Sequence, residues 1–114
     1  MNWFKGGIMH NIENYTEEIF EKIKHIDEDG NEFWYARELM VALEYSEFRK
    51  FKSIIEKAII TCKGSLKKVD DHFARVGGMV EIGSKAKRKV EDYKLTRYAC
   101  YLIALNGDPR KRDR

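Results

Sequence analysis

Histidines, cysteines and adjacent carboxylates are the residues of this chain that could bind a metal ion or move a proton. The histidines are scattered, and neither an H-x₃-H nor a C-x₂-C spacing occurs. Asp70, Asp71 and His72 are consecutive, but successive side chains of a helix point about 100° apart and do not converge. Neither cysteine has a base that the sequence would place beside it. We therefore predict no catalytic residues, no metal and no cofactor, and a protein that is not an enzyme.

Charge is distributed unevenly between the two halves of the chain. Residues 1–48 hold 4 basic and 11 acidic side chains, whereas residues 49–114 hold 18 basic and 8 acidic ones. A basic region of this kind attracts polyanions, and salt weakens the attraction. The second half therefore predicts contact with nucleic acid, although solvated lysines on ordinary helices would produce the same count.

The densest positive charge lies at the expected tip of a β-hairpin. Short β-prone segments at residues 79–82 and 89–93 flank a turn that begins at Gly83. This region carries four cations: Lys85, Lys87, Arg88 and Lys89. Together with backbone amides of the turn, they could reach phosphate oxygens, and we predict that they bind nucleic acid. A flexible solubilising loop is the alternative.

A second set of cations lies on an expected helix over residues 46–62. Its apolar positions keep helical spacing, and four cations lie elsewhere on its surface, Lys57 and a set of three nearer its start: Arg49, Lys50 and Lys52. A preceding helix over residues 36–43, joined by a tight turn, makes the pair resemble a helix-turn-helix, whose second helix enters a major groove. We predict that these three cations flank a groove or a single strand of DNA.

The other elements are predicted from periodicity and turn residues. Residues 16–21 form a short helix, and an Asp-Gly turn at residues 27–30 pairs residues 22–26 with 32–35. Residues 69–76 form a helix that Gly77 and Gly78 end, and a stripe from Leu95 to Asn106 predicts the last helix. The predicted class is α+β, a mainly helical single domain with two short β-hairpins at about residues 22–35 and 79–93.

The chain is predicted to consist of a flexible leader (1–15), one domain (16–109) and a charged tail (110–114). No apolar run approaches the roughly 18–20 residues of a membrane span, and no export signal is present. Cys62 and Cys100 both fall on apolar helical faces, which fits packed, reduced thiols. We expect a cytoplasmic protein without membrane contact, and the sequence leaves its oligomeric state open.

Two aromatic residues in the acidic half predict a different kind of partner. Trp34 and Tyr35 follow the first hairpin turn, and exposed aromatic side chains are frequent anchors at protein interfaces. They are candidate partner-binding residues. Alternatively, Trp34 lies in the core beside Phe33 or forms a platform for a stacked base.

Several blocks of this sequence resemble the amino-terminal part of the bacterial DNA-damage-inducible protein D family. The final block ends in Asn106-Gly107-Asp108-Pro109, and the blocks occur in order over about residues 18–111: 23–39, 43–49, 69–73, 79–84 and 94–109. They are similar, more distantly, to the Bro amino-terminal domain of phage antirepressors and viral proteins.

The resemblance implies a module in which a hairpin, helices and a second hairpin bind DNA. It implies a protein of the SOS response that acts on recombination, where family members inhibit the strand-exchange recombinase by disturbing its filament on DNA. The antirepressor likeness implies instead a prophage module that binds a phage repressor. Neither implies enzymatic activity, and the family offers no catalytic residues to carry over.

Three features depart from the family pattern. Residues 63–68, Lys-Gly-Ser-Leu-Lys-Lys, replace a stretch that usually reads more like Glu-Asn-Ser-Gly, and the eight residues before Met9 look foreign. Relatives also continue past the Asn-Gly-Asp-Pro block into a long helical half. We therefore expect a truncated product, an isolated domain or a stand-alone prophage relative.

Overall fold

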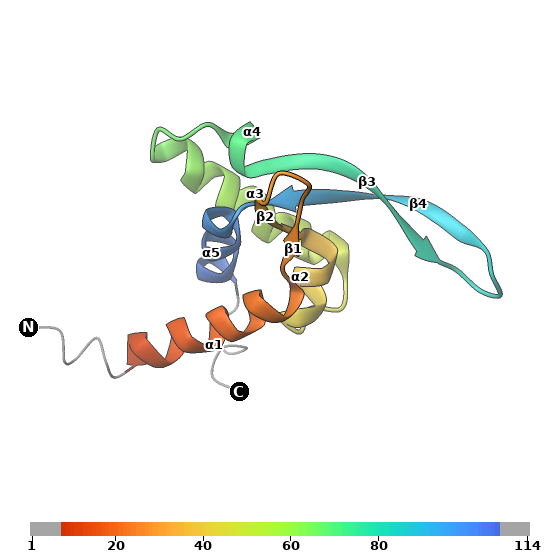
Figure 1. The fold of residues 1–114 in the computed structure, drawn as a ribbon, viewed down its shortest axis with the longest axis horizontal. Helices are drawn as coiled ribbons and strands as arrows, with labels where there is room; N and C mark the ends of the chain where they lie inside the picture. The colour runs from red at the N-terminus through yellow and green to blue at the C-terminus, as the bar shows by residue number, and fades with distance from the viewer. Residues whose placement is uncertain (1–7, 108–114) are drawn as a thin grey trace, which may run out of the picture.

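A computed structural model describes residues 8–107 of the chain, with side chains from residue 16 onward. The elements are α1 (Ile8–Ile23), β1 (His25–Ile26), β2 (Glu32–Tyr35), α2 (Ala36–Ala42), α3 (Phe48–Gly64), α4 (Val69–His72), β3 (Phe73–Glu81), β4 (Lys87–Leu95) and α5 (Arg97–Asn106). The strands form one antiparallel sheet in the order β1-β2-β4-β3 (Figure 1). The predicted α+β class, with one hairpin in each half, is confirmed.

The first hairpin forms at the predicted turn because Asp27 organises it. The carboxylate Oδ1 of Asp27 accepts hydrogen bonds from the backbone N–H groups of Asp29 and Asn31, each at 2.9 Å. Gly30 completes the turn with a φ of +85°, a conformation that glycine adopts without a Cβ penalty. The first strand is shorter than expected, since β1 contains only His25 and Ile26, whereas β2 has the predicted bounds.

The first helix is longer than the sequence indicates. α1 begins at Ile8 rather than at residue 16, and it runs to Ile23, so residues 22 and 23 are helical and not part of a strand. Residues 1–7 of the expected leader and the expected tail at 110–114 lie outside the described residues. The next two predicted helices are confirmed within two residues at each boundary, as α2 and α3.

The predicted helix over residues 69–76 is wrong beyond its first turn. Only Val69–His72 is helical, and Phe73 begins a nine-residue strand that passes through Gly77 and Gly78. β3 pairs with β4 from Phe73↔Leu95 to Glu81↔Lys87 without a bulge. The second hairpin is therefore much longer than residues 79–93, because cross-strand pairing holds two glycines that local propensity assigned to a break.

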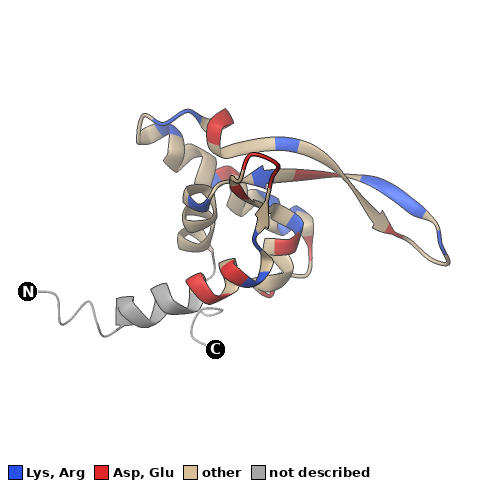
Figure 2. Ribbon diagram, in the orientation of Figure 1, with Lys and Arg blue, Asp and Glu red and all other residues tan. Residues whose placement is uncertain are grey.

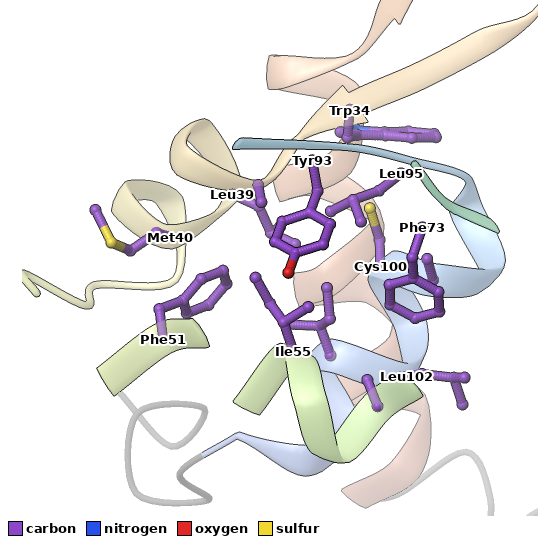
Figure 3. Packing of buried hydrophobic residues seen from close by; sticks show 14 of the residues in the cluster. Trp34, Leu39, Met40, Phe51, Ile55, Phe73, Tyr93, Leu95, Cys100 and Leu102 are labelled. Carbon is purple, nitrogen blue, oxygen red and sulfur yellow. The ribbon is translucent and has the colours of Figure 1, made fainter. Parts of the chain in front are cut away.

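The core lies between one face of the sheet and the helices. Trp34 and Leu95, which are directly paired on β2 and β4, are fully buried with Phe51 and Ile55 of α3. Figure 3 shows Leu95 close to Leu39 of α2 and Cys100 of α5, with the α3 side chains on the facing side. Burial of this apolar surface is the main source of the fold's stability.

An ion-pair network joins the two helices at the opposite ends of the chain. The guanidinium of Arg97, at the start of α5, contacts Glu17 of α1 at 2.6 Å, Glu21 of α1 at 3.0 Å and Glu32 of β2 at 2.9 Å. Tyr101 donates its hydroxyl to the same Glu17 at 2.7 Å. The network fixes α1 against α5 and the edge of the sheet.

Candidate nucleic-acid interface

The long β3–β4 hairpin leaves the body of the molecule as a two-stranded ribbon. Figure 1 shows it extending beyond the helices, and the longest dimension of the molecule is 54 Å. We call residues 77–90 the ribbon arm, because every residue from 81 to 89 is exposed, whereas Asp92, Tyr93 and Leu95 are buried. Six residue steps at about 3.3 Å each give the arm a length of about 20 Å.

The two faces of the ribbon arm differ in character, because residues paired across an antiparallel ladder share a face. The register places Met79, Glu81, Lys87 and Lys89 together on what we call the polar face. The other side, the apolar face, contains Gly78, Val80, Ile82, Ala86, Arg88 and Val90. Hydrogen bonding from the Ile82 N–H to the Ala86 carbonyl, at 2.9 Å, continues the ladder to the tip.

The four cations predicted at the tip are all exposed. Lys87 and Lys89 are on the polar face, Arg88 is on the apolar face, and Lys85 lies in the turn with a φ of +66°. Within residues 16–107, none of the ion pairs involves these four residues, although Lys87 is directly opposite Glu81. Figure 2 shows the basic segments of β4 and the turn concentrated at the far end of the arm.

A carboxylate clamps the base of the ribbon arm to the body. Glu91 of β4 contacts the Lys52 ammonium of α3 at 2.8 Å and the Arg75 guanidinium of β3 at 2.5 Å. The hydrogen bond from Lys52, followed by that from Arg75, holds the pKa of Glu91 below its usual range, and the same contact with Glu91 raises the pKa of Lys52. The structure therefore places Lys52 in an intramolecular clamp that orients the arm.

Asp92 forms a second anchor beside this clamp. Its Oδ1 accepts hydrogen bonds from the backbone N–H groups of Arg37, at 3.0 Å, and of Tyr93, at 2.8 Å. Burial is the main influence on this carboxyl, and it raises the pKa of Asp92 despite these bonds. Arg37 also donates from Nε to the carbonyl of Glu91 at 2.8 Å, so α2 and the arm base are held together.

The other cations of α3 are arranged less favourably for DNA. Arg49 and Lys50 are exposed in its first turn, but Glu47 immediately precedes the helix and its carboxylate contacts Lys50 at 3.2 Å. A recognition helix contacts bases with its amino-terminal residues, where an exposed carboxylate would face phosphates. The ribbon arm is therefore the stronger candidate interface.

The structure separates the two predicted partner anchors. Trp34 is 0% exposed, donates its indole N–H to the Phe20 carbonyl at 2.9 Å and packs edge-on against the Phe20 ring, so its prediction as an exposed anchor is wrong. Alternation along β2 explains the difference, since Trp34 faces the helices while Tyr35 faces away. Tyr35 is half-buried and contacts the rings of His25 and Phe33.

The apolar face of the arm was not predicted from the sequence. On this face the large hydrophobic side chain of Ile82 is 48% exposed. The polar face also carries one large hydrophobic side chain, that of Met79, which is 59% exposed. The alternation Gly78, Val80, Ile82 is a signal that could have found this face, once β3 was known to extend through the glycines.

The metal-ligating and thiol side chains of the described residues lie apart or are buried. In residues 16–107, no group of three or more His, Cys, Asp or Glu side chains is positioned to hold a metal ion. Cys62 and Cys100 are buried free thiols, and burial raises the pKa of Cys100. Across the described helices, none has the length and apolar character needed to cross a membrane.

The chain is similar to one protein family and to a protein of known name. The model of the BRO family N-terminal domain matches residues 22–114. A protein of Escherichia coli (strain K12), DNA damage-inducible protein D, is 47% identical over 98 residues, which cover 86% of this chain. The chain spans 36% of the length of that relative. No solved structure matches the chain.

Proposed function

Since this chain belongs to the BRO family as an N-terminal domain, we propose that it is a non-enzymatic, DNA-binding regulatory module whose ribbon arm contacts the phosphate backbone. The observation that carries the proposal is the ribbon arm itself, an exposed protrusion with Lys85, Lys87, Arg88 and Lys89 at its end. Cations without internal partners can neutralise phosphates and release counterions.

Cations on both faces suit a ribbon that enters a groove. The two walls of a DNA groove carry the phosphates of opposite strands, so a ribbon between them meets phosphate on each side. Lys87 and Lys89 would reach one wall, and Arg88 the other or the groove floor. The clamp at Glu91 presents the arm in one direction, and Arg49 and Lys50 are proposed to make peripheral phosphate contacts only.

The biological setting is proposed from the relative. Its name ties it to DNA damage, and 47% identity over most of this chain supports a related setting here. We place the module in the SOS response, acting on recombinase filaments assembled on DNA in the bacterial cytoplasm. Because the chain spans 36% of the length of that relative, an assay of filament assembly with this chain tests the proposed modulation directly.

Removal of the tip lysines tests DNA binding. We expect the triple variant K85A/K87A/K89A to bind duplex DNA roughly tenfold or more weakly near physiological salt, with the slope of log affinity against log salt reduced by about 3. Fluorescence anisotropy of a labelled duplex over a salt series measures both quantities.

A matched control separates the arm from net charge. The variant K57A/K63A/K68A removes three exposed lysines from α3 and the segment that follows it. This control variant should retain most of the wild-type affinity for duplex DNA. Equal losses in the two variants, or binding by the wild-type chain that does not respond to salt, would contradict the proposal.

Docking on a protein is the second candidate function, favoured by one surface feature. A pocket of about 580 Å³ is lined by the end of α1, His25 and α2. His25 touches Tyr35, and Val41 at the pocket is 68% exposed. Such a pocket suits an apolar anchor from a recombinase or a phage repressor.

Retention of the chain on purified recombinase, or on a phage repressor, without DNA tests this candidate. The substitution Val41→Asp should abolish retention and leave DNA affinity unchanged. Ile60→Asp is the matched control, because Ile60 is also 68% exposed but lies on α3. If neither partner retains the wild-type chain, only the DNA-binding function is left.

A further inference from the structure

The apolar face of the ribbon arm has no cover from the rest of the described chain near its tip. Figure 1 shows the outer part of the arm beyond the helices, and Ile82 is 48% exposed there. Exposure of Ile82 to water is unfavourable, and the half-buried Val80 and Val90 lie on the same face along the arm. A partner that covers this strip would remove its apolar area from water.

The two faces of the arm differ in their acidic residues. The carboxylates of the arm and its base, Glu81 and Glu91, are both on the polar face. On the apolar face the corresponding acid is Asp92, which is 7% exposed and accepts two backbone hydrogen bonds. The exposed part of the apolar face therefore offers a polyanion one cation, Arg88, and no facing carboxylate among the described residues.

We propose that the ribbon arm enters the minor groove of duplex DNA with its apolar face leading, and that Ile82 inserts between two base pairs as a wedge. This inference rests on the proposed DNA-binding function. Apolar side chains that enter the minor groove partly unstack a base step and kink the duplex. The major groove is less suitable, because base edges there are read by hydrogen-bonding groups and Arg88 is the one such side chain on this face.

The dimensions of the groove add a consequence. The minor groove of B-form DNA is about 6 Å wide, whereas two paired strands alone are about 4.8 Å apart before side chains are added. The arm therefore fits only a widened groove, and a wedge that kinks the duplex widens it. Arg88 would then lie in the groove, while the longer Lys87 and Lys89 side chains reach phosphates at its edges. DNA bending is the predicted signature.

Two single substitutions on opposite faces test the wedge. Ile82→Ala removes apolar surface from the leading face, and Met79→Ala removes it from the polar face at similar exposure. Neither changes charge, so the salt slope should stay at the wild-type value in both. Affinity of the Ile82→Ala variant should change by less than about tenfold, because the lost apolar contact and the unstacking that no longer occurs offset each other.

The readouts are the bend and the base stack of a short duplex. Energy transfer between dyes on its two ends should report a bend with the wild-type chain and with Met79→Ala, and a straight duplex with Ile82→Ala. A 2-aminopurine probe at the contacted step should brighten in the same two cases. Circular dichroism confirms that each variant is folded.

The outcomes distinguish this inference from the function on which it rests. Salt-dependent binding without bending overturns the wedge and leaves the phosphate contact intact, whereas absence of DNA binding overturns the proposed function. Equal effects of the two substitutions also overturn the wedge. So does sedimentation that shows a wild-type dimer dissociated by Ile82→Ala, since the apolar face would then join two copies of this chain.

Discussion

At the residue scale, Arg97 has more ion-pair partners than any other cation of the described residues, and it lies in the body and not on the arm. Arg97 contacts three glutamates, and these contacts raise its pKa. The hydrogen bond from the Arg97 guanidinium is the main cause of the lowered pKa of Glu32. The pKa of Glu21 is also lowered, mainly by a hydrogen bond from Lys24 and next by one from Arg97. One side chain thus holds together segments that are 65 to 80 residues apart in sequence.

Replacement of Arg97 should therefore reduce stability. We expect Arg97→Gln to lower the free energy of unfolding by about 1–2 kcal/mol at pH 7, a value discounted for partial exposure. Urea titration measures it. Arg49→Gln is the control for loss of one exposed positive charge, and a similar change in both variants would argue against the network.

Acid should lower the stability of the fold by protonating Glu32, a partner of Arg97. The folded-state pKa of Glu32 lies below the ordinary value of 4.5, so its contribution is complete above pH 4.5 and declines as pH falls through the lower folded value. Wild-type stability should fall over that range, and the fall should be shallower in Arg97→Gln. Parallel pH profiles would contradict this account.

At the element scale, the ribbon arm depends on its base for direction. A two-stranded ribbon is marginally stable alone, so the arm takes its order from the pairing of β4 with β2 and from the clamp between Glu91, Lys52 and Arg75. The same pairing explains why β3 continues through Gly77 and Gly78. Neither glycine is required there, since a Cβ at Gly77 would meet no atom within 4 Å, and one at Gly78 would make only ordinary contacts, the nearest at 3.5 Å from Asp92.

Release of the clamp should loosen the arm without unfolding the body. In Glu91→Ala we expect faster hydrogen exchange of the backbone amides near residues 75–79, because Lys52 and Arg75 lose their common partner. Glu81→Ala, near the tip, should leave these amides at the wild-type rate. The clamp should also weaken in acid, as pH falls through the lowered pKa of Glu91. Unchanged exchange in Glu91→Ala would show that strand pairing alone orders the base.

At the scale of the whole molecule, the structure separates a packed body from a solvated arm. The core residues lie in α1, β2, α2, α3, the inner ends of β3 and β4, and α5. The acidic turn of the first hairpin and the basic end of the arm lie in different parts of the molecule (Figure 2). Stability therefore belongs to the residues of the body, whereas the proposed binding of a polyanion belongs to those of the arm.

Shortening the arm tests this separation. Replacing residues 79–89 with an Asn-Gly turn would close the hairpin between the paired residues Gly78 and Val90. We expect the melting temperature to stay within a few degrees of wild type, since the core is retained, and DNA binding to be lost. Thermal melting and fluorescence anisotropy check the two halves of this expectation, and a shortened chain that still binds DNA would assign the interface to the body.

Local chemistry determined several features from the sequence alone. The Asp27 carboxylate and Gly30 specify the first turn within five residues, and the apolar stripe of α5 predicts its packed face and its end at Asn106. The cations at the tip of the arm are likewise visible in the sequence, because a cluster of four needs no distant partner to be recognised.

Features that depend on distant partners were decided by the tertiary structure. Whether residues 73–78 form helix or strand is settled by pairing with β4, since their partners lie 12 to 22 positions further along the chain, from Gly78↔Val90 to Phe73↔Leu95. The burial of Trp34 depends on the helices that cover β2, and the partners of Arg97 depend on α1 meeting α5. Local propensities for these states differ by little, whereas long-range burial and pairing contribute more, so the packed arrangement selects among them.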